Sequence, residues 1–546
     1  MANSITNSSK KINFPLQLLE GVRGWLIDNK LLILIISLAL FIRVCKLDQI
    51  PPSPNWDEVS LGYNAYSILQ TGRDEWGTIL PSVFRAYGDY KLPLYIYTLV
   101  PFIKLFDLNT FSIRFLSATA GTLSVFIFYL ILNKLFPTKK FLQLLGTTII
   151  AFSPWSIFIS RIALEANLGL TFFLISFYLM ISQKYWQSSL FFGLFLFTYN
   201  SSRVILPFYV FTLIFLIFKS KYKLKKNIFG FIPFVLLICL FVYQSLVQNA
   251  TDRYKWVTLL DSGAINQINN LQNQYGRLLV NKATFLSFKV TQNYISHFDP
   301  KYVFWNGGSQ YQFSLPNFNL IAPLFLPIFL IGLIVLIKSN PTILFYLLIS
   351  PLPSAITRDA PHVLRSLTFL PFITITIIYG LNYLSKFINS KIILSIFTVV
   401  IFLNLSFFWQ KYQKYATDYA GSWQYGNYQV AEYIKQHYHD YSQILITKKY
   451  GEPHEFLVFN QKYPPYSYQT IPKDWNFHAD WYWVDGFDKY RFLNDWEIKS
   501  LTSKISQPTL LITSPQNYNE PNSQLLETIY YPNGLPVYDI VLLNEN

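Results

Sequence analysis

Charged residues are scarce in this sequence of 546 residues, of which only 13% are Asp, Glu, Lys or Arg. Soluble globular domains carry about 25%, so the chain has too few charges to cover a surface that faces water. This argues against a purely soluble enzyme. Cysteine is also rare, and two residues, Cys45 and Cys239, exclude a disulfide scaffold.

Apolar residues are abundant instead. Hydrophobic residues make up 52% of the chain and aromatic residues 18%, with 49 Phe and 39 Tyr. This much apolar surface to bury excludes intrinsic disorder. The net charge is +15, from 44 Lys and Arg against 29 Asp and Glu. In a soluble protein such an excess indicates nucleic-acid binding, but here the lysines fall between long apolar runs, so we expect no nucleic-acid partner.

Apolar runs long enough to span a bilayer recur from about residue 31 to about residue 410. A helix of about 20 residues crosses the hydrocarbon core of about 30 Å. The first run, Leu31 to Leu47, follows several basic residues and precedes no small-residue cleavage site, which predicts a retained first helix. With it, the predicted spans number about eleven. The others are 111–134, 141–160, 166–183, 186–200, 204–218, 227–246, 318–338, 341–357, 362–384 and 391–410.

The distribution of lysines sets the predicted orientation. If residues 1–30 are a cytoplasmic segment, every predicted cytoplasmic turn carries lysine, as the positive-inside rule requires. Segment 92–106 is apolar but contains Pro93 and Pro101, and we predict an interfacial or re-entrant piece there, because a further span would place these lysines outside. The lysines are Lys134, Lys139, Lys140, Lys184, Lys219, Lys221, Lys223, Lys225, Lys226, Lys338, Lys386 and Lys391.

The predicted fold is therefore an all-α polytopic membrane protein in the plasma (inner) membrane, with a soluble α/β domain on its extracytoplasmic side. The transmembrane domain covers 31–410, with outer loops 48–110 and 247–317, and the outer domain covers 411–546. Within the outer domain a helix is predicted at Asn427–His437. Strands are predicted at Gln443–Thr447, Phe456–Phe459 and Thr509–Ile512.

Polar residues gather on the predicted outer face, which indicates chemistry there. ATP and nucleotide sugars are absent outside the cell, and the sequence contains no GxxxxGK[ST] phosphate loop. An enzyme acting on this side would draw its energy from a lipid-linked or otherwise exported donor.

The candidate site residues lie in the outer loops. Asp57 and Glu58 follow the first span, where a carboxylate can act as a general base or bind a hard divalent cation, unless it is simply solvated. Lys91 precedes an apolar piece and can hold a lipid phosphate, or snorkel to headgroups. Arg161 and Glu165 are four residues apart and share a helix face if the helix continues, where they would also suit a local ion pair.

Further cations occupy other outer turns. Arg203 can bind a phosphate bidentately. His362 and Arg365 are three apart, on one face of a predicted helix. Each residue alone also suits anchoring to anionic membrane lipids. The predicted cations for the donor phosphate are Lys91, Arg161, Arg203, His362 and Arg365. With the carboxylates, they form the inventory that a polyprenyl-phosphate leaving group and a hydroxyl acceptor require.

The chain resembles bacterial glycosyltransferases of family 39 and their relatives, which include the protein O-mannosyltransferases and the aminoarabinose transferase of lipid A. The resemblance rests on Asp57-Glu58, on Lys91-Leu-Pro-Leu and on Ser160-Arg-Ile-Ala-Leu-Glu165. The stretches Tyr199-Asn-Ser-Ser-Arg203 and Pro361-His-Val-Leu-Arg365 are similar to further motifs. It covers roughly residues 30–410 and implies the GT-C membrane fold.

The resemblance implies inverting transfer of a sugar from a polyprenyl-phosphate donor to a hydroxyl of a protein, lipid or glycan. Asp57 would be the general base and Glu58 its companion. Lys91 would lie near the donor phosphate, although the family more often spells this segment Lys-Pro-Pro-Leu. Glu165 would match an acidic position at which many members have Asp. Metal dependence varies within the fold and stays open; Asp57 and Glu165 would be the ligands of a divalent cation.

Two other functions stay open on the sequence alone. A flippase or transporter of lipid-linked saccharides would need polar residues near mid-membrane, whereas the charges here lie at outer helix ends. An O-antigen ligase or polymerase would depend on one large late loop, and loop 247–317, with Trp256 and Trp305, suits saccharide stacking. A structure in which Asp57 and Glu165 share one cavity would favour the transferase over both.

Overall fold

The computed structural model describes residues 29–88, 90–220, 228–247, 258–478, 481–501, 507–521 and 523–543. The predicted N-terminal segment 1–30 lies almost entirely outside these ranges, as do Trp256 and the lysines between 221 and 226. The helices of the described chain are α2 (Lys30–Val44), α3 (Trp56–Thr71), α4 (Pro93–Phe106), α5 (Thr110–Leu135), α6 (Lys140–Phe152), α7 (Pro154–Ser160), α8 (Glu165–Ile181), α9 (Tyr185–Leu196), α10 (Ser201–Lys219), α12 (Ile232–Val247), α14 (Ser262–Tyr275), α15 (Lys282–Ser296), α16 (Phe325–Ser339), α17 (Pro341–Ile349), α18 (Leu352–Ala355), α19 (Phe369–Leu384), α20 (Ser390–Asp418), α21 (Asn427–Gln436), α22 (Pro453–Asn460), α23 (Pro465–Thr470) and α24 (Asp495–Leu501).

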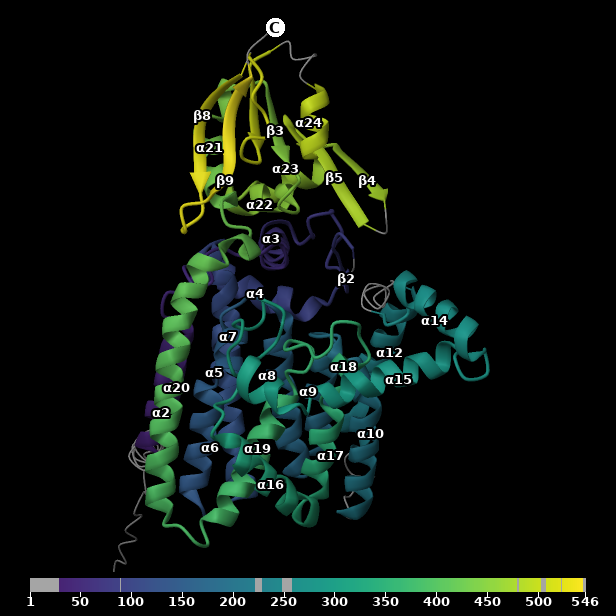
Figure 1. Ribbon diagram of the computed structural model, residues 1–546, viewed down its shortest axis with the longest axis vertical. Coiled ribbons are helices and arrows are strands. Elements are labelled where there is room, and N and C mark those ends of the chain that lie inside the picture. Colours follow the sequence, from purple (N-terminus) through teal and green to yellow (C-terminus); the bar gives the residue numbers. More distant parts are fainter. Residues whose placement is uncertain are drawn as a thin grey trace, which may run out of the picture.

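The molecule consists of a helical bundle with a sheet domain stacked on one end of it (Figure 1). Helices α3 and α4 lie between the two parts. Helices α14 and α15, from the predicted loop 247–317, project sideways from the bundle. The predicted mixture of a helical membrane part and a C-terminal α/β part is therefore present.

Fewer helices meet the length and hydropathy criteria for a membrane span than the eleven predicted. By length and composition, four stretches of the described chain can cross a membrane: α5, α10, residues 228–246 and α20. The bent pair α6 and α7 would make a fifth. The remaining apolar helices have 10 to 17 residues, including α4, α8, α16 and α19, so the count of eleven is not confirmed.

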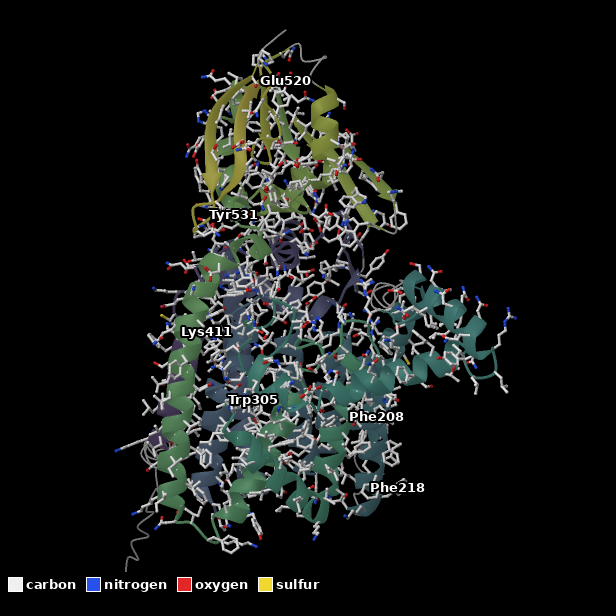
Figure 2. All side chains as sticks on the ribbon, viewed as in Figure 1. Phe208, Phe218, Trp305, Lys411, Glu520 and Tyr531 are labelled. Atoms are coloured by element: carbon white, nitrogen blue, oxygen red, sulfur yellow. The ribbon has the colours of Figure 1, made fainter. Side chains whose placement is uncertain are left out.

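The outer surface of the bundle is apolar. Figure 2 shows Phe208 and Phe218 on α10, and Phe218 is 79% exposed. Phe407 and Leu403 on α20 are also exposed. An apolar surface of this extent needs a lipid environment, so the chain is a membrane protein.

Two lysine-bearing turns lie at the same end of the bundle. Lys139, between α5 and α6, donates to Asn382 near the end of α19, with 2.6 Å between Nζ and Oδ1. The connection from α19 to α20 lies at the end away from the sheet domain (Figure 1). This agrees with the predicted parity of the spans, while the orientation in the membrane stays a prediction.

Two expected helix faces are absent. Helix α7 ends at Ser160 and α8 begins at Glu165, so Arg161 and Glu165 do not share a helix. Pro154 and the Ser153 cap start α7 anew, and the chain turns again before α8. His362 and Arg365 lie in turns before α19 begins at Phe369. Their spacing of three is therefore not a helical spacing.

The C-terminal domain contains a mixed sheet of seven strands. Its order is β4-β5-β6-β3-β7-β9-β8, and β3 runs parallel to both β6 and β7. The strands are β3 (Gln443–Thr447), β4 (Lys473–His478), β5 (Trp481–Phe487), β6 (Tyr490–Leu493), β7 (Thr509–Thr513), β8 (Ser523–Tyr530) and β9 (Pro536–Leu543). A two-stranded sheet, β1 (Phe84–Arg85) with β2 (Tyr90–Lys91), lies in the loop before α4.

The predictions for this domain were partly right. The helix at 427–437 and the strands at 443–447 and 509–512 are confirmed. The strand predicted at Phe456–Phe459 is wrong, because these residues belong to α22, whose buried aromatic and β-branched side chains mimic a strand pattern. The boundary at 411 falls inside α20, which runs on to Asp418.

The two parts share one hydrophobic core. Val59 and Ile113 of the membrane part pack in the same buried cluster as Ile446, Phe459 and Ile512 of the C-terminal domain. Phe459 of α22 lies against Gly62 of α3, where a Cβ atom would overlap its ring. The C-terminal domain is thus fixed on α3, the helix that carries Asp57.

Candidate active site

Asp57 lies in the first turn of α3, at the junction of the two parts. The sequence sets the helix start: Pro54 ends the preceding loop, and Asn55 caps the helix by accepting from the Glu58 amide at 3.0 Å. The Glu58 carboxylate in turn accepts a hydrogen bond from the Asn55 amide at 3.1 Å, which completes a capping box. An acidic first turn is also favoured by the helix dipole.

Glu58 is held in a fully buried ion pair. Arg114 of α5 donates from Nε and Nη2 to the two carboxylate oxygens at 2.9 and 3.0 Å, and neither side chain is exposed. The other Arg114 hydrogens go to main-chain carbonyls of Leu47, Pro51 and Ser53, so all five N–H groups are used. The Ala163 amide also donates to Glu58, at 2.7 Å.

Arg161 and Arg43 fix the segment before α3 in the same way. The two terminal nitrogens of Arg161 donate to the carbonyls of Ile42, Arg43, Lys46 and Ile50 at 2.7 to 3.1 Å. Arg43 donates to Ser160, Ser156 and the carbonyl of Ala151. Both side chains are fully buried. Arg161 was predicted to bind the donor phosphate; here its terminal N–H groups are used by the main chain.

Lys91 forms an ion pair with Asp57. The sequence predicts a role for each residue but not their contact. Its Nζ lies 2.5 Å from Asp57 Oδ1, and the two side chains are 8% and 32% exposed. Lys91 ends β2, immediately before α4 begins at Pro93, so the strand pairing with β1 and the helix start together fix its position. A carboxylate and an ammonium thus meet where residues 34 apart in sequence converge.

The pair faces a small cavity between the two parts of the molecule. Its volume is about 40 Å³, room for about three water molecules. The lining residues come from α3, from the loop before α4 and from the C-terminal domain. They are Trp56, Asp57, Ser60, Ala86, Tyr87, Gly88, Lys91, Glu452, Glu455 and Trp481.

Two indole rings join the walls of the cavity across the domain boundary. The ring of Trp56 lies against Gly451 of the C-terminal domain, and the ring of Trp481 lies against Gly88 of the membrane part. A Cβ atom on either glycine would overlap the facing ring. The Tyr482 amide also donates to the carbonyl of Tyr87 at 2.7 Å. The walls of the cavity are therefore held together by reciprocal contacts between the two parts of the molecule.

Sequence reasoning missed the acidic residues of the C-terminal wall. Glu452 accepts from Trp481 Nε1 at 2.6 Å, and burial raises its pKa to about 7. Burial, followed by the carboxylates of Glu75, Glu452 and Asp57, raises the pKa of Glu455 well above its usual range. Burial raises the pKa of Glu75 to about 7 as well. The available signal was the pair of acids in the otherwise apolar segment Glu452-Pro-His-Glu-Phe-Leu-Val-Phe.

Glu165 is not among the lining residues of this cavity. It is the first residue of α8 and is buried, at 7% exposure. The cavity beside Asp57 therefore does not provide the shared Asp57–Glu165 cavity that would favour the transferase over the two other functions.

The remaining predicted cations lie around the neighbouring helix starts. Arg203 is in the first turn of α10, with its guanidinium over the ring of Phe241. His362 is buried, and its Nδ1 accepts from the amides of Leu364 and Arg365. Arg365 donates to Thr357 at 2.9 Å and pairs with Asp359. Its carbonyl accepts from Ser201, so α10 and the turn with Arg365 are in contact.

The residues at Asp57 do not fit a divalent cation. The Lys91 ammonium, 2.5 Å from the carboxylate, stands where a cation would be bound. Among the residues the structure describes, no group of three or more His, Cys, Asp and Glu side chains is arranged for a metal.

Comparison with known proteins relates the N-terminal part of the chain to a family model. A family model described as dolichyl-phosphate-mannose-protein mannosyltransferase matches residues 33–244, which include Asp57, Lys91 and Glu165. No protein with a curated description matches the sequence.

Solved structures resemble the whole chain. The apo crystal structure of ArnT from Cupriavidus metallidurans is similar with a TM-score of 0.51 at 12% identity, covering 96% of this chain and 98% of that one. The structure of ArnT from the same organism bound to undecaprenyl phosphate has a TM-score of 0.49 at 11% identity, with coverages of 94% and 98%. At this identity the likeness is one of fold.

The helical bundle and the C-terminal sheet domain together therefore have a fold similar to that of ArnT. The sequence match to the mannosyltransferase family model is confined to residues 33–244.

Proposed function

We propose that this protein transfers a sugar from a polyprenyl-phosphate donor to an acceptor hydroxyl at the outer face of the plasma membrane, with inversion. The observation that carries the proposal is the Asp57–Lys91 pair, 2.5 Å apart in a cavity between the bundle and the C-terminal domain. The description of the matching family, which names dolichyl-phosphate-mannose, supports a donor of the polyprenyl-phosphate class.

Lys91 is assigned to the donor phosphate. Departure of a polyprenyl phosphate from the anomeric carbon builds negative charge on the leaving oxygens. A preorganised ammonium stabilises that charge most where water is scarce, and the Lys91 side chain is only 8% exposed. We propose that the donor phosphate also contacts three further cations, which are Arg203, His362 and Arg365. Arg161 is reassigned to positioning, since its terminal donors hold main-chain carbonyls.

Asp57 is assigned as the general base. While Lys91 lies beside it, the ammonium favours the charged carboxylate and makes it a weaker base. A donor phosphate that draws Lys91 away would release Asp57 to accept the proton of the acceptor hydroxyl. The hydroxyl oxygen then attacks the anomeric carbon as the phosphate leaves, which inverts the configuration. Donor binding would thus precede acceptor activation, and the base contributes about 10²–10⁴-fold.

Glu58 is assigned a positioning role, because its ion pair with Arg114 fixes the first turn of α3. For Glu165 a role on the acceptor side stays a prediction. We further propose the predicted topology: a cytoplasmic N-terminus, about eleven crossings, and loops 48–110 and 247–317 together with the C-terminal domain on the outer face.

The test is the Asp57→Asn variant, purified in lipid nanodiscs and assayed with radiolabelled polyprenyl-phosphate sugars and an envelope extract as acceptor. Transfer should fall by about 100-fold or more, while the elution volume and unfolding temperature stay those of the wild type. The matched control is Asp107→Asn, which removes an outer-face carboxylate that pairs with Lys462, away from the cavity. Near-wild-type turnover in Asp57→Asn would overturn the assignment.

A further inference from the structure

The cavity beside Asp57 has an acidic wall that the proposed reaction does not use. Glu455 of α22 lines it and is 2% exposed. Its Oε2 atom is buried and has no hydrogen-bond partner among the residues described. Buried polar atoms are nearly always hydrogen-bonded in native proteins, and a buried polar atom without a hydrogen bond costs stability. A residue that lines a cavity and has an unpaired carboxyl oxygen is what a ligand-binding group would present before its ligand arrives.

The position of Glu455 is fixed by its helix rather than by its carboxyl. Phe459, one turn later on α22, packs against Gly62 of α3, and the Glu455 amide donates to the carbonyl of Glu452. Glu452 differs, because its carboxyl accepts from Trp481 and so has a structural partner. Of the two acids on the C-terminal wall, Glu455 is the one whose oxygen is available to a ligand.

The charge state of Glu455 follows from its surroundings. Burial is the largest cause of its raised pKa, and the carboxylates of Glu75, Glu452 and Asp57 act in the same direction, while Lys91 opposes them. These surroundings favour the neutral carboxyl, which donates one hydrogen bond and accepts others. Sugar hydroxyls offer the matching combination of donor and acceptor.

We propose that the cavity between α3 and α22 is the acceptor subsite, and that Glu455 binds a second hydroxyl of a saccharide acceptor beside the hydroxyl that Asp57 deprotonates. This inference rests on the proposed function, because it takes Asp57 as the base. It makes the C-terminal domain a part of the active site.

A saccharide fits this wall better than a protein side chain. A serine or threonine carries one hydroxyl, which Asp57 would use, and leaves nothing for Glu455. A sugar carries hydroxyls on adjacent carbons. The indoles of Trp56 and Trp481 also line the cavity, and each keeps part of its surface exposed. Such rings present flat apolar faces suited to a sugar ring. A volume of about 40 Å³ admits the hydroxyls while the ring stays at the mouth.

The experiment measures binding and requires no turnover. The full chain in nanodiscs containing undecaprenyl phosphate is titrated with a panel of methyl hexosides and methyl pentosides, and with a capped Ala-Ser-Ala peptide, by saturation-transfer NMR. At least one glycoside should bind and the peptide should not. Glu455→Leu should weaken glycoside binding about tenfold, whereas Glu455→Gln, which keeps both a donor and an acceptor, should stay within about threefold. The control Glu432→Gln, on α21 outside the cavity, should bind as the wild type does.

Three outcomes would overturn the inference: no glycoside binds, Glu455→Leu binds as well as the wild type, or the peptide binds in place of the glycosides. Should Glu455→Leu fail to fold, Glu455→Gln is compared with Glu455→Asp instead. The carboxyl of Glu455→Asp is withdrawn by one methylene, so this variant should lose more glycoside affinity than Glu455→Gln. Failure of the proposed function is separate, because it would appear as normal turnover in Asp57→Asn whatever the glycosides do.

Discussion

Asp57 and Glu58 are neighbours in sequence but differ in burial and in the cation that each one pairs with. Both carboxylates pair with a cation, but the Asp57 side chain is 32% exposed at a cavity and meets a lysine, whereas Glu58 is fully buried and meets an arginine. The arginine fork holds Glu58 through two bonds and the surrounding main chain through three more. In the proposed mechanism, Asp57 takes part in the reaction and Glu58 positions the first turn of α3.

The difference in partner explains the division. An arginine presents five donors in a rigid fork, so a fully satisfied Arg–Glu pair leaves no group for a substrate. A lysine ammonium is a compact charge on a flexible stem, and can leave Asp57 for a phosphate. A carboxylate that must change its partner during a reaction is therefore better paired with a lysine than with an arginine.

The largest expected effect comes from breaking the buried pair. Glu58→Ala leaves the Arg114 charge without its counterion in a site that is not exposed, which should cost about 3–5 kcal/mol of unfolding free energy. Thermal unfolding in nanodiscs measures it. Asp57→Asn is the matched comparison, and should cost less than about 1 kcal/mol because its pair is partly exposed. Equal unfolding temperatures for Glu58→Ala and Asp57→Asn would contradict the greater contribution of the Glu58 ion pair to stability.

A smaller effect is expected from the lysine. Lys91→Ala should raise the KM for the polyprenyl-phosphate donor about tenfold to a hundredfold, because a hydrogen bond to a charged group is lost, and should leave the acceptor KM unchanged. Lys91→Arg keeps the charge and should recover part of the loss. Initial-rate kinetics with each substrate varied in turn measure both constants. A fall in kcat alone would mean that Lys91 acts only by orienting Asp57.

The smallest expected effect is a pH dependence of stability. Burial raises the pKa of Glu452 to about 7, above its unfolded value near 4.5. The folded state therefore holds the proton more tightly, and stability should be highest below about pH 4.5 and fall as the pH rises to about 7. Unfolding temperatures between pH 5 and 8 measure the slope. Glu452→Gln stays neutral throughout and should show a flatter profile; parallel profiles would contradict the burial argument.

The sequence predicted those parts of the site that are local. Asp57 and Lys91 could be found because each stands at a boundary between a loop and an apolar run. Their pairing could not, since it depends on how β2 and α3 come together across 34 residues. Periodicity places the apolar runs well, but it cannot tell a broken helix from a continuous one, as the turn between Arg161 and Glu165 shows.

The C-terminal wall lay beyond sequence reasoning for a different reason. Glu455 is about 400 residues from Asp57, and it reaches the cavity only because α22 packs on α3. The sequence predicts a strand in the segment after it, because the pattern Phe-Leu-Val-Phe is as typical of a buried strand as of a buried helix. A strand would have alternated its side chains and separated Glu455 from the face that packs on the membrane part.

The buried arginines set an order of events for the growing chain. The segment from Ile42 to Ser53, just ahead of Asp57, is held by guanidinium groups that arrive later, from Arg114 of α5 and from Arg161 after α7. A nascent chain that has emerged only as far as α4 has none of these donors to fix Asp57. Assembly of the catalytic end of the bundle must therefore wait until the helices around residues 110–161 have entered the membrane, and a chain stalled before them would insert but remain inactive.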